Sequence, residues 1–167
     1  QKNKIFEKSV EQRPENNLYV FYDGPPFISG LPHYGHLLSS IAKDIIPRYW
    51  TMKGKRVERI WGWDAHGLTV ENKVQKKLNV ANRRDIEAYG LEEFTKACYE
   101  YTSETSEEWR WYVNKIGRWV DMDRAYRTTD SNYMESVMWA FKKLYDKGLI
   151  YEGVRTSLYC PTCGTPV

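Results

Sequence analysis

The order of the short apolar runs, and of the loops that interrupt them, constrains this chain most. Residues 18–22 are rich in β-forming side chains and end at residues 23–26, Asp-Gly-Pro-Pro, which neither a strand interior nor a helix interior accepts. Residues 37–52 then repeat apolar side chains at the spacing of one helix face, and residues 57–61 form a second β-rich run that ends at Gly62. A buried strand, a loop, a helix and a strand in this order predict a parallel α/β unit.

The helix expected over residues 37–52 has two features that bear on its length. Gly54 is a plausible C-terminal stop, and Pro47 lies inside the pattern, where the missing amide hydrogen should kink the helix or shorten it. The apolar stripe of this helix consists of Leu37, Ile41, Ile45, Tyr49 and Met52.

Two further helices are predicted after this unit. The helix over residues 91–116 carries, on or near one face, Phe94, Cys98, Tyr101, Trp109, Tyr112 and Ile116. Another helix should begin at Asp130 or Ser131 and end at Gly148, and residues 149–163 then look extended and turn into a cysteine knuckle. Residues 1–17 are polar and mixed, so we expect them to lead into the domain without contributing a core element.

Composition excludes several classes of protein. An aromatic content of 15% indicates either a substantial buried interior or a larger protein whose interfaces are exposed by truncation. A net charge of +3 is too small to indicate a nucleic-acid binder. No apolar stretch approaches the ~18 residues that span a bilayer, and the start lacks the apolar run of a signal peptide. Three cysteines do not form the framework of a secreted disulfide protein. We therefore expect a cytoplasmic protein that does not interact with membranes.

The histidine pair at the start of the first helix is the strongest local indication of chemistry. A helix start presents unpaired N–H groups and the positive end of the dipole, which suit a phosphate group. His33 and His36 can reach one anion from this turn, and Gly35 removes a side chain, so a flat base could approach the backbone. The arrangement suits stabilisation of a phosphoryl group under attack. On spacing alone, the two histidines could equally be surface or metal-binding residues.

The cysteine knuckle near the end of the sequence predicts a metal site. Cys160 and Cys163 are separated by two residues, and two thiolates on a tight turn can share one tetrahedral zinc ion. A structural zinc site needs four ligands, so the pair is only half of a site and would bind zinc weakly by itself. Cys98, on an apolar helix stripe, is expected in the core.

Taken together, these motifs resemble those of the isoleucyl-tRNA synthetases, class I enzymes whose histidine motif reads His-hydrophobic-Gly-His. The matching segments are residues 23–27, 30–36, 62–68, 119–123 and 134–137. Three motifs in the same order and at fitting separations make the resemblance specific, and it runs over nearly the whole chain. Thr69 stands where the family usually has proline and touches no assigned role.

The resemblance implies a role for each motif residue. It assigns ATP binding, and stabilisation of the transition state of adenylate formation, to His33, Gly35 and His36. It places Gly24 and Pro25 in the wall of the isoleucine side-chain pocket, and a rigid Gly-Pro backbone is suited to form a shaped apolar wall.

The resemblance also implies that Asp64 holds the α-ammonium group of the amino acid. An anionic side chain at the end of a strand can pair with an ammonium group, which agrees with that role. On its own, Asp64 could instead be a helix N-cap before His66 and Gly67.

The implied fold is the first half of a Rossmann-like class I catalytic domain over residues 18–150, after an N-terminal segment of residues 1–17. Residues 151–167 would begin a connective insertion that carries the zinc knuckle and the editing domain, with a second cysteine pair beyond it. The implied substrates and partners are isoleucine, ATP with Mg²⁺, and tRNA(Ile), in a parent enzyme expected to be a monomer. The Lys-Met-Ser-Lys-Ser loop of class I enzymes does not occur in the chain, so we expect little activity from these residues alone.

Three alternatives remain open from the sequence. A sibling valyl- or leucyl-tRNA synthetase shares the histidine motif but usually spells the flanking segments differently. A small nucleotidyltransferase with the same motif would act on a substrate other than an amino acid. A non-catalytic zinc-ribbon or RNA-binding module would use the cysteine knuckle without the chemistry.

Overall fold

The computed structural model describes residues 3–28, 30–161 and 165–166. The chain divides into two units, Gln1–Tyr133 and Met134–Val167, which we call the first and second units. The boundary lies within the helix α6 (Ser131–Asp146), close to its start.

The centre of the first unit is a pair of parallel strands, β1 (Ile60–Trp63) and β2 (Asp121–Arg127). Gly62 lies opposite Tyr126, and the register shifts once earlier in the pair. Parallel neighbours need a long crossover connection, and here three helices supply it. The parallel α/β character expected from the sequence is therefore confirmed, although β2, and not residues 18–22, is the paired strand.

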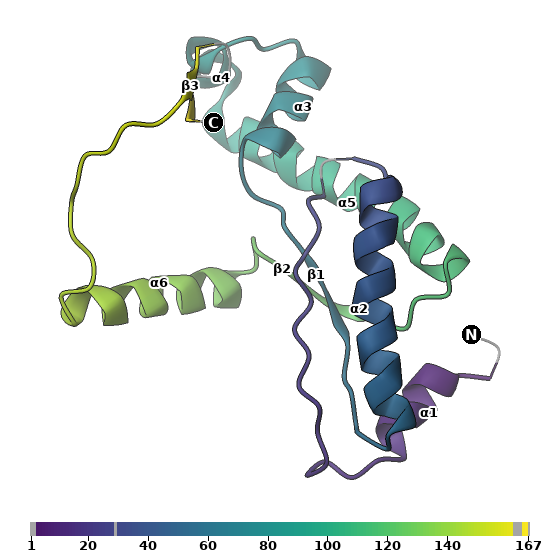
Figure 1. Cartoon of the computed structure of the whole chain (residues 1–167). Coiled ribbons are helices and arrows are strands. Elements are labelled where there is room, and N and C mark those ends of the chain that lie inside the picture. Colours follow the sequence, from purple (N-terminus) through teal and green to yellow (C-terminus); the bar gives the residue numbers. More distant parts are fainter. Residues whose placement is uncertain (1–2, 29, 162–164, 167) are drawn as a thin grey trace. The chain divides into compact units, whose positions relative to one another are not determined.

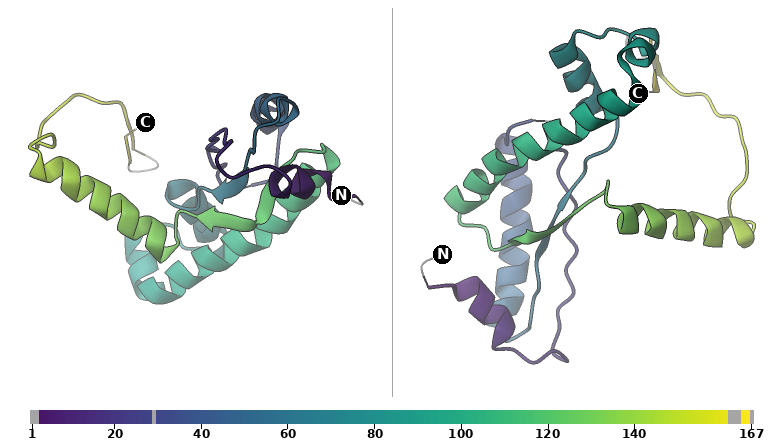
Figure 2. Two further views of the ribbon diagram at one scale, coloured as in Figure 1. Left: turned by 90° about the horizontal axis from the view of Figure 1, so that it is seen from below. Right: turned by 180° about the vertical axis from the view of Figure 1, so that it is seen from behind.

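The strand pair is covered on both faces by the two longest helices. Figures 1 and 2 show α2 (Tyr34–Met52) on one face and α5 (Leu91–Lys115) on the other. Covering helices on both faces are typical of parallel sheets, which need burial on both sides. The predictions of helices over residues 37–52 and 91–116 are confirmed, with bounds that differ by a few residues.

The crossover also contains two short helices, α3 (Leu68–Leu78) and α4 (Arg83–Tyr89). Asn82 caps α4, because its side-chain oxygen accepts the backbone N–H groups of Arg84 and Asp85. Both helices pack against α5. Neither was expected from the sequence.

A cluster of tryptophans fills the space between the strands and α5. The Trp61 and Trp63 rings lie 5.3 Å apart, and each lies 5.9 Å from the ring of Trp109 on α5. All three side chains are almost fully buried. Cys98 is half-buried against the same core, as expected, and burial raises the pKa of its thiol, with a smaller effect from Glu71.

The N-terminal segment forms a helix, α1 (Ile5–Glu11), which the sequence did not predict, but none of its described residues belongs to the buried hydrophobic core, as expected. The buried guanidinium of Arg59 lies 5.4 Å from the ring of Phe6 on α1 and 5.4 Å from the ring of Trp119. Burial lowers the pKa of Arg59 to about 10. Helix α1, which carries Phe6, has only 7 residues, and so short a helix shows no clear periodicity of apolar side chains in the sequence.

Residues 18–22 do not form the buried strand that the sequence predicts. Leu18 pairs with Arg56 and Phe27 pairs with Asp64, both in parallel, but no ladder continues between these two bridges. Leu18, Val20 and Tyr22 are exposed. Pro25 and Pro26, which lie between the two bridges, have no amide hydrogen to donate, so they cannot extend a ladder there.

Two further details of the prediction are wrong. The second strand occupies residues 60–63 instead of residues 57–61, and Gly62 lies inside it. Helix α2 continues past the buried Pro47 to Met52, so the proline does not shorten it. The hydroxyl of Thr51 donates to the Pro47 carbonyl at 2.9 Å, and the carbonyl that loses its helical donor to the proline is that of Lys43, four residues earlier.

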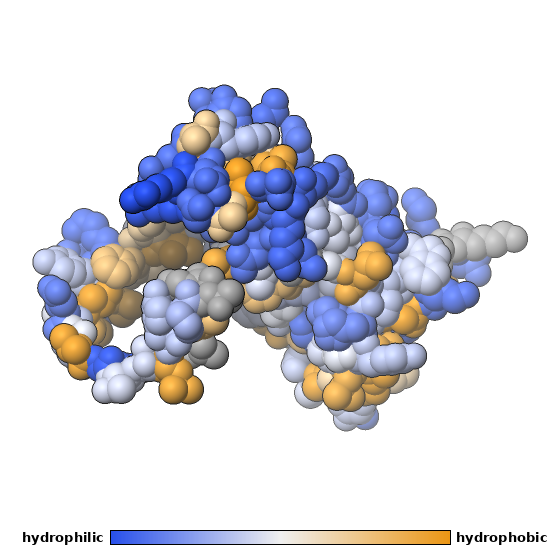
Figure 3. All heavy atoms as spheres, turned by 90° about the horizontal axis from the view of Figure 1, so that it is seen from above, coloured by the Kyte–Doolittle hydropathy of each residue, from blue (hydrophilic) through white to orange (hydrophobic). Residues whose placement is uncertain are grey.

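The expected apolar stripe of α2 is largely exposed. Ile41, Ile45, Tyr49 and Met52 keep between 47% and 78% of their surface, whereas Ser40, Pro47 and Thr51 face the interior. Figure 3 shows apolar side chains reaching the surface in several patches among hydrophilic ones.

The second unit contains most of α6 and the segment that follows it. Gly148, with φ of +68°, ends this helix as predicted. Residues 151–158 have no regular structure, and β3 (Tyr159–Cys160) pairs antiparallel with β4 (Thr165–Pro166). None of the helices in the described parts of the chain has the length and apolar character to cross a membrane.

The close approach of Tyr126 to Gly62 gives a test of the strand pairing. A Cβ atom at Gly62 would overlap the Tyr126 ring, so Gly62→Ala should lower the free energy of unfolding by about 1–3 kcal/mol. Gly30→Ala is the matched control, because a Cβ there meets nothing within 4 Å. Urea denaturation followed by tryptophan fluorescence measures both. Equal stability of the two variants would contradict this packing.

Candidate functional site

The histidine motif forms the start of α2. His33 is the N-cap residue, with extended backbone, and His36 lies in the first turn of the helix. The backbone N–H of Gly35 donates to Nδ1 of His33 at 3.1 Å, and the backbone N–H of His33 donates to Nδ1 of His36 at 3.1 Å. The two side chains therefore cap the helix reciprocally, as a capping box does. Their rings lie 3.8 Å apart, which confirms the expectation that they lie close together.

These capping bonds determine which ring nitrogen carries the proton. Because both Nδ1 atoms accept a backbone N–H, each neutral imidazole must hold its proton on Nε2. Each ring of the pair, His33 and His36, then has one N–H donor that the cap does not use. Two such donors beside a helix start are an arrangement suited to an anion.

Gly35 is required by the conformation of His33. A Cβ atom at Gly35 would lie 2.9 Å from Cε1 and 3.1 Å from Nδ1 of that ring. Any side chain at this position would therefore push the His33 ring out of its cap. The missing side chain makes room for the imidazole, a role that the spacing alone did not indicate.

His36 lies against the core of the first unit. Its ring packs edge-on to Trp109, with the centroids 4.7 Å apart. The indole N–H of Trp109 donates to the Gly30 carbonyl at 2.9 Å, so α5 holds the loop that leads into the histidines. Burial, and then the charges of His33 and Lys43, lower the pKa of His36, which favours its neutral form.

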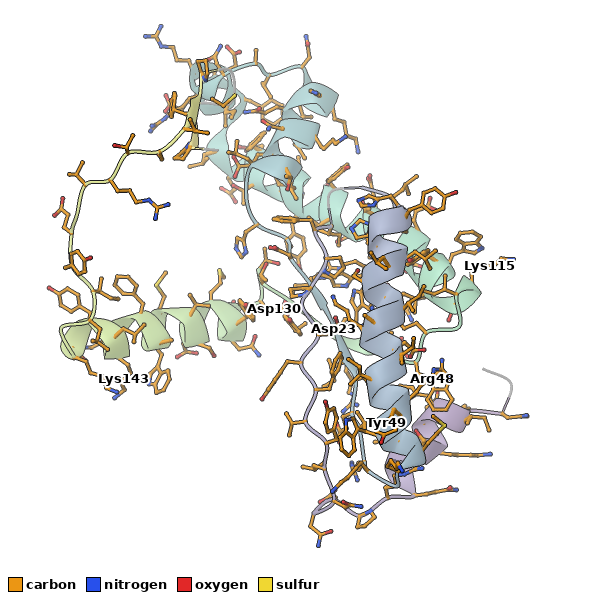
Figure 4. All side chains as sticks on the ribbon, viewed as in Figure 1. Asp23, Arg48, Tyr49, Lys115, Asp130 and Lys143 are labelled. Atoms are coloured by element: carbon orange, nitrogen blue, oxygen red, sulfur yellow. The ribbon has the colours of Figure 1, made fainter. Side chains whose placement is uncertain are left out.

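The segment that contains Gly24 is fixed by ionic contacts. The Asp23 carboxylate forms a buried ion pair with Arg118 and lies 2.9 Å from the ammonium of Lys43, without hydrogen-bond geometry in the second contact. The Lys43 ammonium donates to the Gly24 carbonyl at 2.6 Å, and the Tyr126 hydroxyl approaches the Asp23 carbonyl at 3.4 Å. Figure 4 shows Asp23 beside α2. Gly24 and the adjoining proline are therefore held against the helix that carries the histidines.

Asp64 lies directly after β1 and pairs with the same loop. Its backbone N–H donates to the Pro26 carbonyl at 2.9 Å, and its carbonyl accepts the Ile28 N–H at 3.0 Å. Asp64 does not cap the next helix, because Gly67 is the N-cap of α3. Among the described residues, no hydrogen bond or ion pair engages its half-buried carboxylate. The N-cap alternative is therefore wrong.

The tyrosine Tyr126 faces this group of residues from β2. Burial, together with Tyr133, Asp23 and Asp64, raises the pKa of its phenol. Its ring stacks on Tyr133 with centroids 5.6 Å apart. The hydroxyl therefore stays protonated at neutral pH, as a neutral donor directed at the Asp23 carbonyl.

The cysteine knuckle is described only in part. Cys160 ends β3 and is half-buried, whereas Cys163 lies outside the described residues. Within the described parts of the chain, no group of three or more His, Cys, Asp or Glu side chains could hold a metal ion. The half zinc site stays a prediction.

Several residues that shape this site were missed in the sequence. Lys43 follows His36 by seven residues, close to two helical turns, so it lies on the same helix face and could have been found by spacing. Asp23 and Arg118 are 95 residues apart, and Trp109 and Gly30 are 79 apart. No local pattern in one sequence connects such positions.

Comparisons with known proteins agree with this geometry. The family model "tRNA synthetases class I (I, L, M and V)" matches residues 1–167. The chain is 53% identical over 165 residues to isoleucine–tRNA ligase 2 of Pseudomonas fluorescens, covering 99% of this chain and 16% of that protein. It is 53% identical over 167 residues to the isoleucine–tRNA ligase of Wolbachia pipientis wMel, covering 100% and 15%. The chain thus spans about a sixth of the length of these relatives.

A solved structure supports the fold. The LeuRS–tRNA–LeuAMS ternary complex of Agrobacterium radiobacter K84 matches with a TM-score of 0.62 and 21% sequence identity, over 89% of this chain and 17% of that chain. At this identity the likeness concerns the fold alone. It supports the catalytic-domain fold of class I synthetases for the parallel strand pair and its flanking helices.

The lowered pKa of His36 predicts a pH dependence. Its ring should titrate below the ordinary value of 6.5 in an NMR titration. Because the unfolded chain then binds this proton at higher pH than the folded chain does, the free energy of unfolding should fall as the pH decreases below about 6.5. His36→Asn should remove this part of the pH dependence. A midpoint at or above 6.5 would contradict the packing described for His36.

Proposed function

The chain belongs to the family of class I tRNA synthetases (I, L, M and V), and on this premise we propose that it is part of an isoleucine–tRNA ligase. The enzyme would activate isoleucine with ATP to isoleucyl-adenylate and then transfer the aminoacyl group to tRNA(Ile). The isoleucine assignment is supported by 53% identity to curated isoleucine–tRNA ligases. The same identity counts against a non-catalytic zinc-ribbon or RNA-binding module.

The observation that carries the proposal is the pair of imidazoles at the start of α2, whose Nε2–H donors the helix cap does not use. In adenylate formation, a carboxylate oxygen of isoleucine attacks the α-phosphorus of ATP in line, and the bond to the pyrophosphate oxygen breaks. Negative charge on the phosphoryl oxygens is redistributed in the transition state. His33 and His36, whose rings lie 3.8 Å apart, would donate to these oxygens. Gly35 leaves the room that the His33 ring needs to stay in this position. Mg²⁺ would arrive with the ATP phosphates, as part of the substrate.

The amino-acid site would lie beside this pair. Gly24 and Pro25 would form the wall against the isoleucine side chain, and Asp64 would bind the α-ammonium group. Support comes from the loop of residues 26–28, which pairs with the backbone of Asp64 and so joins the two halves of the site. The half-buried Asp64 carboxylate, with no described partner, is suited to a cation.

Other parts of the proposal concern the longer protein. Residues 18–150 would form the first half of the catalytic domain and residues 151–167 the start of a connective insertion with editing function. Cys160 and Cys163 would supply two zinc ligands and the rest of the protein two more, because the described residues of this chain do not complete a site. The enzyme would be a cytoplasmic monomer. Activity would belong to the full-length protein, since the chain spans 15–16% of its relatives.

Amino-acid-dependent exchange tests the substrate. The full-length enzyme that carries this sequence should exchange pyrophosphate into ATP when isoleucine is present. Valine should support slower exchange, because it lacks one methylene of the isoleucine side chain and so fills the pocket less well. Exchange with leucine or valine but not with isoleucine would assign the chain to a sibling enzyme instead.

Alanine substitution tests the roles of the histidines. His33→Ala and His36→Ala in the full-length enzyme should each lower kcat of adenylate formation by about 10²–10³-fold with little change in the KM for ATP, because the lost donor acts mainly in the transition state. Pre-steady-state or exchange kinetics measure both constants. A rise in KM at unchanged kcat would show that the imidazoles bind only the ground state.

A further inference from the structure

Lys43 occupies a position that none of the motif assignments uses. Its ammonium donates to the Gly24 carbonyl at 2.6 Å and lies 2.9 Å from Oδ1 of Asp23. The lysine belongs to α2, whose first turn carries His33 and His36. One side chain therefore connects the histidine helix to the loop on the other side of the candidate site.

The orientation of Lys43 is set by its surroundings. The helix places it close to two turns after His36 and thus on the same face. The Asp23 carboxylate that receives its charge is buried and held from the other side by Arg118, whose guanidinium lies 5.0 Å from the Trp61 ring centroid. Asp23 is thereby fixed to the core, and the ammonium has a rigid partner. The Lys43 side chain itself is 28% exposed, on the surface side of this contact.

We propose that Lys43 is a positioning residue that ties the wall at Gly24 and Pro25 to the helix that carries His33 and His36. The inference rests on the proposed function, because it assumes that the wall binds the amino acid and the helix binds ATP. The attacking carboxylate and the α-phosphorus are held by different segments, and in-line attack requires their distance to be constant. A misplacement of about 1 Å between reacting groups can lower the rate by about 10²-fold.

A second effect of the same ammonium reinforces this role. The charge of Lys43 is one of the causes that lower the pKa of His36, together with burial and the neighbouring His33. The Trp109 side chain, which packs on His36 from α5, carries no charge. Lys43 is thus the cation through which the amino-acid wall influences the protonation of the ATP-binding histidine.

The test compares Lys43→Met with Lys43→Arg in the full-length enzyme. Methionine keeps the length and the helix propensity but removes the charge and the donor, whereas arginine keeps both. Lys77→Met is the matched control, because it removes an exposed ion pair between Lys77 on α3 and Glu104 on α5. Exchange kinetics give kcat and KM for isoleucine and for ATP, and thermal unfolding gives the stability of each variant.

We expect Lys43→Met to lower kcat/KM for isoleucine by at least tenfold while the KM for ATP changes less than twofold. Lys43→Arg should recover most of the loss, and Lys77→Met should behave as the unmodified enzyme. The acidic limb of the pH profile should move to higher pH in Lys43→Met, because the pKa of His36 rises when the cation is removed. If Lys43→Met does not fold, Lys43→Gln, which keeps polar volume without the charge, replaces it under the same criteria.

Several outcomes would overturn the proposal. Unchanged kcat/KM below the unfolding temperature, with only a lower Tm, would make Lys43 a structural residue. An equal loss for both substrates, or no recovery with arginine, would do the same. If the unmodified enzyme activates leucine or valine instead of isoleucine, the substrate assignment fails but Lys43 is judged with that amino acid. If it activates no amino acid, the Lys43 proposal falls together with the proposed function.

Discussion

The position of the candidate site in the first unit depends most on the ion pairs of the Asp23 carboxylate. It receives Arg118 from the segment before β2 and Lys43 from α2, and the carbonyl of the same residue is approached by Tyr126 from β2. A buried carboxylate and a buried guanidinium are each unfavourable without the other, and removal of one partner of such a pair costs about 3–5 kcal/mol. The ion pair of Asp23 with Arg118 therefore fixes the start of the loop that contains Gly24, and so fixes the position of Gly24 relative to α2.

The sequence predicted the helices whose apolar side chains repeat over many turns, and the helix end that a glycine marks. Helices α2, α5 and α6 repeat apolar side chains over many turns, and Gly148 ends α6 with a positive φ. The short elements could not be predicted in the same way. Helix α1 spans 7 residues and is held by Arg59 through Phe6, a contact between positions far apart in sequence. The run at residues 18–22 has the composition of a strand, yet its ladder is interrupted, because register depends on a partner that composition does not reveal.

The same division applies to the candidate site. The proximity of His33 and His36 follows from their spacing at a helix start, and the structure confirms it. Their tautomers depend on which atoms cap the helix, and this cannot be read from spacing. The sequence allowed two roles for Asp64, a helix N-cap or a ligand of the amino acid. Because Gly67 is the N-cap of α3, the first role is excluded. Its role as an amino-acid ligand stays a prediction.

The distribution of charge around the site bears on how such an enzyme would release its products. Lys43 contacts Asp23 and donates to the Gly24 carbonyl, and burial together with the charges of His33 and Lys43 lowers the pKa of His36, which favours its neutral form. A neutral imidazole at His36 would be an uncharged N–H donor to a phosphate, aided by the helix dipole. Neutral donors gain most where charge is redistributed, and they hold a fully charged product less tightly than a fixed cation would. In the proposed enzyme, binding energy would then be concentrated in the transition state, where it would raise kcat, and pyrophosphate would leave more readily.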